Sequence, residues 1–508
     1  MSEDTEQSFV PTLAQQGGVM LVGKLGGRVF SFLFLVFVTR AVAPNVYGKF
    51  TLALAVVSIV KDVFNFNLHQ SVDYFLPKAF SEGERTVATG IVGFVSQVVL
   101  LGATVGVIAL VLLRGRIASF FETPALAPIL GVMALIVLFQ SLVDVQKKAF
   151  SSLKRIEYRV MVSDLGFPVL KLLFVATLIV AGYDAYGLAV GHLAALVVGF
   201  SLGAYLLWRR TALPLSIDGL VRPSFSQKRE LFDYAFPLYL TGIIYAVSGQ
   251  ISYLVLGFFL GPSEVAVYRV AYQLTINLAI VNLAIAPVFK PMVSAADDRL
   301  ELRAQYRLAT RWVIMLTVPL VAVLIAAPEV YLQFLFSSDY TAAVVAVVPL
   351  TLGHLFNSFT GPATMLLEGT GHTRVTLFNG LVMVGLNVAL LLLLVPTYGV
   401  LGAGVAAGLT LALLPALAVG EIHAFEAVHP LTLDHGRFLA AGLTAGAVAF
   451  GVSRAIPPAY VVAFLLPPLT LLVYVVGVRL LGGFSSEEQR IAREIDERLG
   501  YTVFEWLV

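Results

Sequence analysis

Four basic residues stand inside apolar stretches in the first half of this sequence: Lys24, Arg28, Lys61 and Lys171. An ionisable side chain near the middle of a membrane costs roughly 2.5–3.5 kcal/mol on insertion scales, so it normally faces a cavity or a partner. Ammonium and guanidinium groups bind phosphate through charge-assisted hydrogen bonds, which are about twice as strong as neutral ones. We therefore expect these four side chains to bind an anionic phosphate or pyrophosphate headgroup. The alternative for Lys24 and Lys61 is that they extend to the membrane surface or pair with Asp62.

The second half of the sequence offers uncharged polar residues within its apolar stretches. One of them, Asn387, follows Lys171 by 216 residues, which is close to the offset of an internal repeat. We expect a division of labour in which the basic half holds the anion and the neutral polar half hydrogen-bonds sugars. Hydrogen bonds that only pack helices together are the competing interpretation. The candidate sugar-contacting residues are Gln250, Asn277, Asn357 and Asn387.

The sequence contains one pattern that resembles a nucleotide site and several histidines, but neither predicts a nucleotide or metal site. Gly18, Gly23 and Lys24 match the spacing of a phosphate-binding loop, but Leu25 replaces the hydroxyl residue and no strand precedes the segment. The seven histidines lack metal-ligand spacing, and there is no cysteine. No segment between apolar stretches is long enough for an ATP or nucleotide-sugar domain. We therefore expect no metal, no cofactor and no catalytic residues, and we expect the protein not to be an enzyme.

The elements that must position these residues are membrane spans. Hydrophobic residues make up 58% of 508 and charged residues only 13%, about half of what a soluble domain carries. The apolar runs suit helices of roughly 20 residues and lack the alternation of barrel strands. The first 17 residues have no basic region of a signal peptide, so the first apolar run is expected to remain as a span. Fourteen spans are predicted near 18–43, 47–70, 88–113, 125–144, 159–181, 185–208, 233–260, 264–290, 311–336, 340–367, 374–395, 399–423, 436–455 and 459–482.

The basic residues predict the orientation of these spans. With the N-terminus inside, the inner loops and the tail hold 23 Lys and Arg residues and the outer loops hold six. Basic residues concentrate in cytoplasmic loops. We therefore expect a multi-pass protein of the cell (cytoplasmic) membrane with both termini in the cytoplasm.

An internal repeat predicts two similar lobes. Ala43-Pro44 matches Gly261-Pro262 at an offset of 218, and Tyr183 with the small residues after it matches Tyr398 at an offset of 215. An offset of six spans leaves both halves facing the same way, with a cavity between them. The predicted domains are a cytoplasmic segment (1–17), an N-lobe of six spans (18–208), a linker (209–232), a C-lobe of six spans (233–423), two further spans (436–482) and a cytoplasmic tail (483–508).

The tail has the pattern of a short helix that lies on the inner membrane face. Ser485 and Glu488 have the spacing of a capping box, and Ile491, Ile495 and Leu499 recur at helical spacing. A solvated tail is the alternative.

Several segments resemble those of a known family in the same order. Residues 39–48 (TRAVAPNVYG) resemble the "arllgpedyGlfa" segment of polysaccharide flippases, and residues 256–272 resemble their "lLGyflGpeavGlYsvAyrl" segment. Gly369-Thr370-Gly371-His372-Thr373-Arg374 and residues 396–402 resemble their "tGrtr" and "pryGllGaa" segments, and the matches extend from about residue 17 to 425. The chain is thus similar to the oligosaccharide-lipid branch of the multidrug/oligosaccharidyl-lipid/polysaccharide exporter superfamily.

This resemblance implies an all-α polytopic fold with fourteen spans, two pseudo-symmetric lobes and an alternating-access cavity. It also implies the movement of a polyprenyl-(pyro)phosphate-linked oligosaccharide from the inner to the outer leaflet, for surface polysaccharide or glycoprotein glycan assembly. The implied partners are the lipid-linked oligosaccharide, membrane lipid and, as a candidate, glycan polymerase or ligase machinery, without nucleic acid. A cation-coupled multidrug or metabolite exporter of the same superfamily is the first alternative. A membrane enzyme of glycan assembly, a polymerase or ligase, is the alternative from another class.

Overall fold

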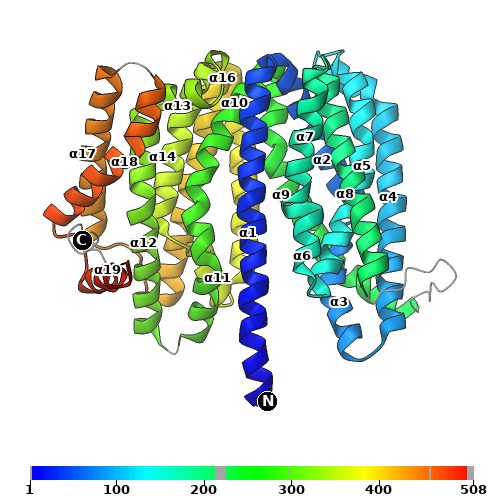
Figure 1. Cartoon of the computed structure of the whole chain (residues 1–508), viewed down its shortest axis with the longest axis horizontal. Helices are drawn as coiled ribbons and strands as arrows, with labels where there is room; N and C mark the ends of the chain where they lie inside the picture. The colour runs from blue at the N-terminus through cyan, green and yellow to red at the C-terminus, as the bar shows by residue number, and fades with distance from the viewer. Residues whose placement is uncertain (1–2, 212–224, 297, 457–458, 500–508) are drawn as a thin grey trace. The chain divides into compact units, whose positions relative to one another are not determined.

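The computed structural model describes residues 3–211, 225–296, 298–456 and 459–499, and these contain helices and no strand (Figure 1). The all-α fold predicted from the apolar runs is confirmed. The chain forms two compact units, residues 1–266 and 267–508. The linker residues 212–224 and the last residues of the tail, 500–508, lie outside the described residues.

The first unit is built from long helices joined by short turns. Its elements are α1 (Glu3–Ala41), α2 (Pro44–Phe64), α3 (His69–Ser81), α4 (Arg85–Phe120), α5 (Leu126–Ser152), α6 (Ile156–Arg159), the π-helix η1 (Val160–Asp164), α7 (Gly166–Val180), α8 (Ala185–Arg210) and α9 (Phe225–Phe259). The helix α10 (Pro262–Thr275) crosses the boundary between the units.

The second unit continues with helices of more varied length. Its elements are the 3₁₀ helix η3 (Ile276–Ala279), α11 (Ile280–Ala295), α12 (Arg299–Ala326), α13 (Pro328–Leu335), the 3₁₀ helix η4 (Ser338–Ala343), α14 (Val344–Thr360), α15 (Ala363–Gly369), α16 (Thr373–Glu426), α17 (Asp434–Ala455), α18 (Ala459–Leu480) and α19 (Ser486–Leu499).

The described residues contain eleven helices that are long and apolar enough to cross a membrane, or twelve when the bent pair α2 and α3 counts as one span. The 54 residues of α16 would extend about 80 Å at 1.5 Å per residue, far more than a hydrocarbon core of about 30 Å. Gly399 breaks α16 with a φ of 59°, at the point where the sequence places a loop between two spans. The expected span at 264–290 is divided by η3. The protein is a multi-pass membrane protein, and the count of fourteen spans stays a prediction.

The structure groups α9 with the first unit, whereas the sequence placed it at the start of the C-lobe. The reason is its packing against α2, where a Cβ atom added to Gly257 would meet the side chain of Leu52 at 2.7 Å. Just beyond α9, a Cβ atom on Gly48 would meet the backbone oxygen of Pro262 at 1.7 Å, so the start of α10 also touches α2. The repeated Pro44 and Pro262 both stand at the first position of their helices, where a proline costs no hydrogen bond.

The apolar side chains gather in separate cores. In the first unit, one core joins α3, α4, α5 and α8 around residues such as Leu68, Val95 and Phe150. In the second unit, one core joins α11, α12, α15 and α16, and another joins α12, α17 and α18 around Ile314 and Phe438. The last two spans are therefore packed on the second unit through α12.

Candidate functional site

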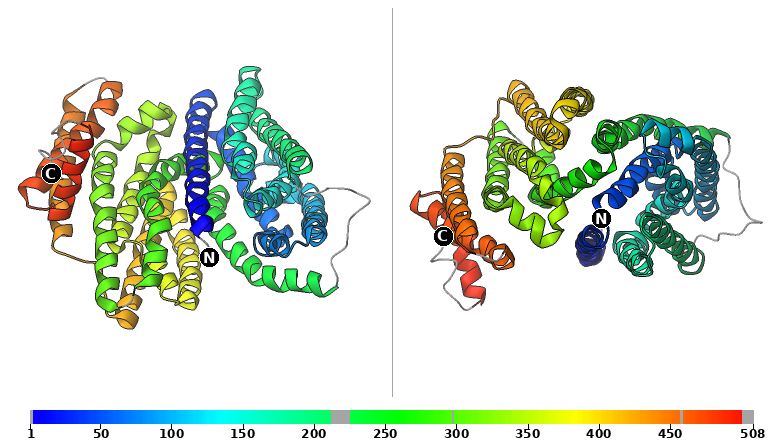
Figure 2. Two further views of the ribbon diagram at one scale, coloured as in Figure 1. Left: turned by 60° about the horizontal axis from the view of Figure 1, so that its bottom comes forward. Right: turned by 90° about the horizontal axis from the view of Figure 1, so that it is seen from above.

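The helix α1 carries Lys24 and Arg28 on the outside of the first unit. A Cβ atom on Gly27 would meet the backbone oxygen of Asp164 at 1.8 Å, and one on Gly23 would meet Val160 at 2.6 Å. These glycines let α1 approach η1 and α7 closely, and the view from above in Figure 2 shows α1 beside α7. Lys24 and Arg28, each one position further along the helix, are exposed. Within the part of the chain that the structure describes, neither has an ion-pair partner.

Lys171 on α7 lies half-buried against the same face of the unit. Its ammonium group is 4.0 Å from the ring centroid of Phe34 on α1 and 5.6 Å from that of Phe167. Aromatic faces attract a cation, so this contact supports a charged lysine in an apolar environment. Phe34 is six residues, or about 9 Å of helix, beyond Arg28. The structure thus brings Arg28, Lys24 and Lys171 onto two neighbouring helices.

Lys61 has a different environment from the other three cations. Its ammonium nitrogen lies 2.9 Å from the carboxylate of Asp62 and 3.1 Å from that of Asp144 on α5. Asp144 is only 13% exposed and also accepts a hydrogen bond from Gln140 at 3.3 Å. Lys61 is therefore neutralised inside the unit, which agrees with the alternative that it pairs with Asp62. Its role in headgroup binding remains a prediction.

Further ion pairs surround Lys61 and Asp144 at the break between α2 and α3. The two helices meet at an angle of 48°, and Phe66 and Asn67 between them adopt positive φ. The backbone at the break is tied to α9, because Tyr239 donates to the carbonyl of Val63 at 2.8 Å and Asn67 donates to that of Leu238 at 2.9 Å. A recess of about 210 Å³ lies here, lined by Lys61, Asp62, Asn67, His69, Asp144, Lys147, Lys148 and Arg159.

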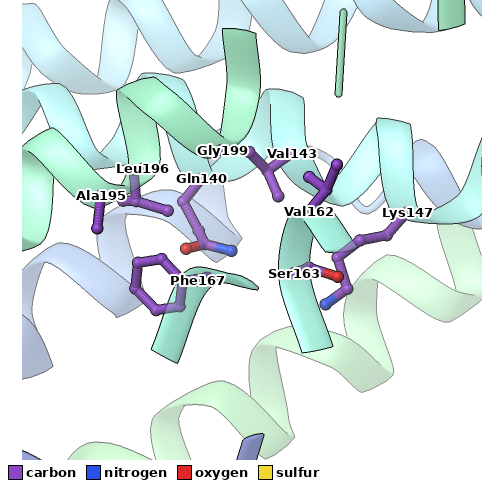
Figure 3. A pocket seen from close by; sticks show the side chains of 9 residues that line it. All are labelled: Gln140, Val143, Lys147, Val162, Ser163, Phe167, Ala195, Leu196 and Gly199. Carbon is purple, nitrogen blue, oxygen red and sulfur yellow. The ribbon is translucent and has the colours of Figure 1, made fainter. Parts of the chain in front are cut away.

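The other cations of this recess are also paired. Lys148 contacts Asp73, and Arg159 lies 3.0 Å from Asp164. A smaller recess of about 90 Å³ shares Lys147 with it, and Gln140 and Phe167 are among its lining residues (Figure 3). Asp144 was not singled out from the sequence. Its signal was its position three residues before Lys147, within a run expected to be a span.

The neutral polar residues of the second half have local roles. The buried Asn387 donates to the hydroxyl of Thr410 at 3.2 Å, which links the two halves of α16. Asn277 donates to the carbonyl of Gln273 at 2.9 Å beside the break at η3. The first bond joins two helical segments, and the second is local to one helical turn. Gln250 and Asn357 are half-buried, and their contact with sugars, like that of Asn277 and Asn387, remains a prediction.

The tail helix α19 begins with the capping box expected from the sequence. The backbone amide of Ser485 donates to the Glu488 carboxylate at 2.7 Å, and the amide of Glu488 donates to the Ser485 hydroxyl at 3.3 Å. The capping box is confirmed. The helix runs crosswise to the longer helices of the second unit (Figures 1 and 2).

A buried ion cluster that the sequence did not reveal attaches this helix to the second unit. Arg311 on α12 binds both carboxylate oxygens of Glu488, at 2.8 and 2.7 Å, and also contacts Asp434 and the carbonyl of Gly483. Sequence reasoning counted Arg311 only as one of the basic residues at an inner loop. Burial raises the pKa of the Glu488 carboxyl, but the hydrogen bonds from Arg311 and Ser485 outweigh burial and hold this pKa below its ordinary value.

This ion cluster predicts that acid releases the tail. A group whose pKa is depressed by folding contributes stability above its unfolded pKa and loses it as the pH falls through the folded value. We expect a spin label at Arg493→Cys, the only cysteine in such a variant, to become mobile as the pH falls below the ordinary pKa of glutamate and through the lower pKa that Glu488 has in the cluster. Glu488→Gln should give a mobile label at neutral pH. Glu494→Gln, at an exposed position on the same helix, should behave as wild type, and a label equally immobile in all three proteins would contradict the prediction.

The helices of membrane-spanning length define a multi-span membrane protein, in which α1 and α7 carry the cations described above. Its fold is that of known transporters. The solved structure of the lipid II flippase MurJ in an inward closed conformation matches with a TM-score of 0.74 at 14% identity, covering 91% of this chain and 98% of that one. An inward-facing multidrug transporter of the MATE family matches with a TM-score of 0.61 at 16% identity, over 79% of this chain and 94% of that one.

The family follows from the sequence comparisons. A family model described as polysaccharide biosynthesis protein matches residues 37–345, and the chain belongs to this family. The probable low-salt glycan biosynthesis flippase Agl15 of Haloferax volcanii is 22% identical over 423 residues, which cover 82% of this chain and 84% of that protein. The probable flippase AglR of the same organism is 27% identical over 256 residues, covering 49% and 53%. The resemblance to the polysaccharide flippases of the exporter superfamily is confirmed.

Proposed function

We propose that this protein moves a polyprenyl-phosphate- or pyrophosphate-linked oligosaccharide from the inner to the outer leaflet of the cell membrane. The observation that carries the proposal is the set of cations on α1 and α7. Lys24 and Arg28 are exposed without an ion partner among the described residues, and Lys171 is held by the ring of Phe34. Charges are costly in a membrane span, and an anionic headgroup would compensate them. The name of Agl15, a flippase of glycan biosynthesis, supports the same substrate class.

The structure supports a headgroup site made of three cations in place of the four expected from the sequence. Lys61 already has two carboxylate partners, so we assign the headgroup to Arg28, Lys24 and Lys171. The protein would supply binding and a path across the membrane, without a catalytic step. Both termini would lie in the cytoplasm, as the distribution of basic residues predicts, and glycan polymerase or ligase machinery would act on the product at the other face.

The test is a flipping assay in liposomes that contain a fluorescent polyprenyl-pyrophosphate oligosaccharide. Access of the sugar to an external lectin is measured over time. We expect protein-dependent crossing that falls about tenfold or more in the Arg28→Gln/Lys171→Gln variant, because each lost charged hydrogen bond is worth about 1.5–3 kcal/mol. The matched control is Arg85→Gln/Arg116→Gln, which removes two exposed charges from the ends of α4.

Each outcome of this assay has a definite meaning. Crossing by the wild type and the control, with loss in the Arg28→Gln/Lys171→Gln variant, would support both the substrate class and the site. Equal crossing by all three proteins would refute the cationic site. Absence of crossing by folded wild-type protein with several glycans would refute the flippase proposal and favour the cation-coupled exporter.

A further inference from the structure

A second basic recess in the first unit differs from the recess at Lys61. It has a volume of about 740 Å³ and lies where the end of α3, the turn between α5 and α6, and the end of α8 meet. Lys78, Lys154 and Arg155 supply its charges, and Phe80 and Leu153 form apolar parts of its wall. Among the residues that the structure describes, no acidic side chain lines it. A recess with three cations and apolar walls suits a ligand that is both anionic and partly apolar.

The charges of this recess are available to a ligand. Lys78 and Lys154 are exposed and have no ion-pair partner in residues 3–211 or the other described ranges. Arg155 lies 3.6 Å from Glu157, and both side chains are about half exposed. Exposed pairs of this kind contribute only about 0–1 kcal/mol, so an incoming phosphate could replace Glu157.

The backbone of the turn that carries two of the cations is held by hydrogen bonds. Lys154 adopts a φ of 55°, a conformation that a lysine rarely takes. Its amide donates to the carbonyl of Ser151 at 3.0 Å, and the amide of Arg155 donates to that of Phe150 at 2.8 Å. The side chain of Gln16 on α1 donates to the carbonyl of Lys154 at 3.1 Å. The turn therefore fixes the backbone from which the two neighbouring cations project, so that binding has to order only their side chains.

The end of α8 indicates the depth of the recess in the membrane. Trp208 and Tyr205 are more than half exposed, and the guanidinium of Arg209 lies 4.5 Å from the Trp208 ring centroid. Tryptophan and tyrosine gather at the level of the lipid headgroups, where one end of the ring is apolar and the other is wet. Thr211, a lining residue of the recess, follows directly. The recess therefore lies at the level at which lipid phosphates lie.

We propose that this recess binds the phosphate group of a membrane lipid. The lipid is either a phospholipid or a polyprenyl phosphate, and the shared chemistry is a phosphate beside an apolar chain. Lys78, Lys154 and Arg155 hold the phosphate, and Phe80 and Leu153 contact the first carbons of the chain. This site is separate from the cations on α1 and α7 and does not depend on the proposed transport.

Binding of short-chain lipids to the purified full chain in a nonionic detergent tests this site. Affinities for dioctanoyl phosphatidylglycerol, farnesyl phosphate and inorganic phosphate are measured by titration calorimetry. We expect Lys78→Gln/Lys154→Gln/Arg155→Gln to weaken binding of at least one lipid by about tenfold or more, because each cation near a lipid surface contributes about 1 kcal/mol. The matched control, Arg299→Gln/Arg374→Gln/Arg493→Gln, removes three exposed charges elsewhere and should bind as wild type.

The three ligands of this experiment distinguish which kind of phosphate the recess binds. Tighter binding of farnesyl phosphate would identify a polyprenyl lipid, and tighter binding of phosphatidylglycerol a phospholipid. Unchanged affinity of the triple variant for both lipids would overturn the proposal, and inorganic phosphate binding as tightly as the lipids would overturn its lipid part. Lys78→Glu alone, at an exposed position, should also weaken lipid binding. This single variant shows whether the loss in the triple variant comes from a folding defect.

Discussion

Replacing Asp144 with asparagine is expected to lower the free energy of unfolding by about 3 kcal/mol. Asp144 is only 13% exposed and accepts from Lys61 at 3.1 Å, and it lies 3.7 Å from Lys147. Removing one partner of a buried ion pair leaves an uncompensated charge, which typically costs about 3–5 kcal/mol. Asp62 remains beside Lys61 and keeps the loss at the lower end of that range. The measurement is thermal and denaturant unfolding of the purified protein in detergent, followed by intrinsic fluorescence.

The matched control for this variant is Asp233→Asn. Asp233 pairs with Arg229 on α9 at 3.5 Å, and both side chains are more than 70% exposed, so its loss should cost less than about 1 kcal/mol. Replacing the three linked charges together, as Lys61→Met/Asp62→Asn/Asp144→Leu, should recover part of the stability lost in Asp144→Asn, because neither the ammonium group nor a carboxylate of this cluster then remains without its partner. Equal stability of Asp144→Asn and Asp233→Asn would show that the ion pair contributes nothing.

Replacing Gly27 with alanine is expected to cost about 3 kcal/mol and to move α1 away from η1. The added Cβ atom would lie 1.8 Å from the backbone oxygen of Asp164, a distance that no side-chain rearrangement can relieve. Overpacking of this kind costs roughly 1–3 kcal/mol, and a clash with backbone lies at the upper end. Since α1 also carries Arg28, the transport proposed above should fall as well. Unfolding and the liposome assay measure the two effects.

Gly18→Ala is the control in the same helix. Gly18 is exposed and an added Cβ atom would meet nothing within 4 Å. Alanine stabilises a helix by roughly 0.5–1 kcal/mol relative to glycine, so this variant should be as stable as wild type or slightly more stable. A result in which Gly27→Ala behaves like Gly18→Ala would contradict the close packing of α1 on η1.

The sequence predicted the elements well because lipid imposes a simple rule on composition. Apolar length alone placed α4, α5, α8, α17 and α18, since every backbone group in a membrane must be bonded within its own helix. The same rule says little about breaks inside a span. The bend after Phe64 and the 3₁₀ turn at η3 depend on what neighbouring helices offer to the freed backbone groups, such as the hydroxyl of Tyr239 for Val63.

The cations of the candidate site could be singled out from the sequence, but their neighbours could not. Lys24, Arg28 and Lys171 could be identified because a charge in an apolar run is conspicuous. The aromatic partners of Lys171 could not be identified from the sequence. Phe34 and Phe167 resemble other aromatic residues of a span, and only the packing of α1 beside α7 shows that they contact this lysine. Lys61 had the same signal as the others, yet Asp144, 83 residues away, neutralises it.

The sequence by itself determined the class of protein, its all-helical multi-pass fold, the family and the capping box of the tail. These properties depend on composition, on spacing along one helix and on short motifs, all of which are local. The tertiary structure alone decided which cations are paired, where α9 belongs, how Arg311 attaches the tail and where Lys78, Lys154 and Arg155 meet. The physical reason is that packing energy and hydrogen bonds need atomic contact, and that an ion pair is strongest when its partners lie close together, so all of them depend on contacts between residues that are far apart along the chain.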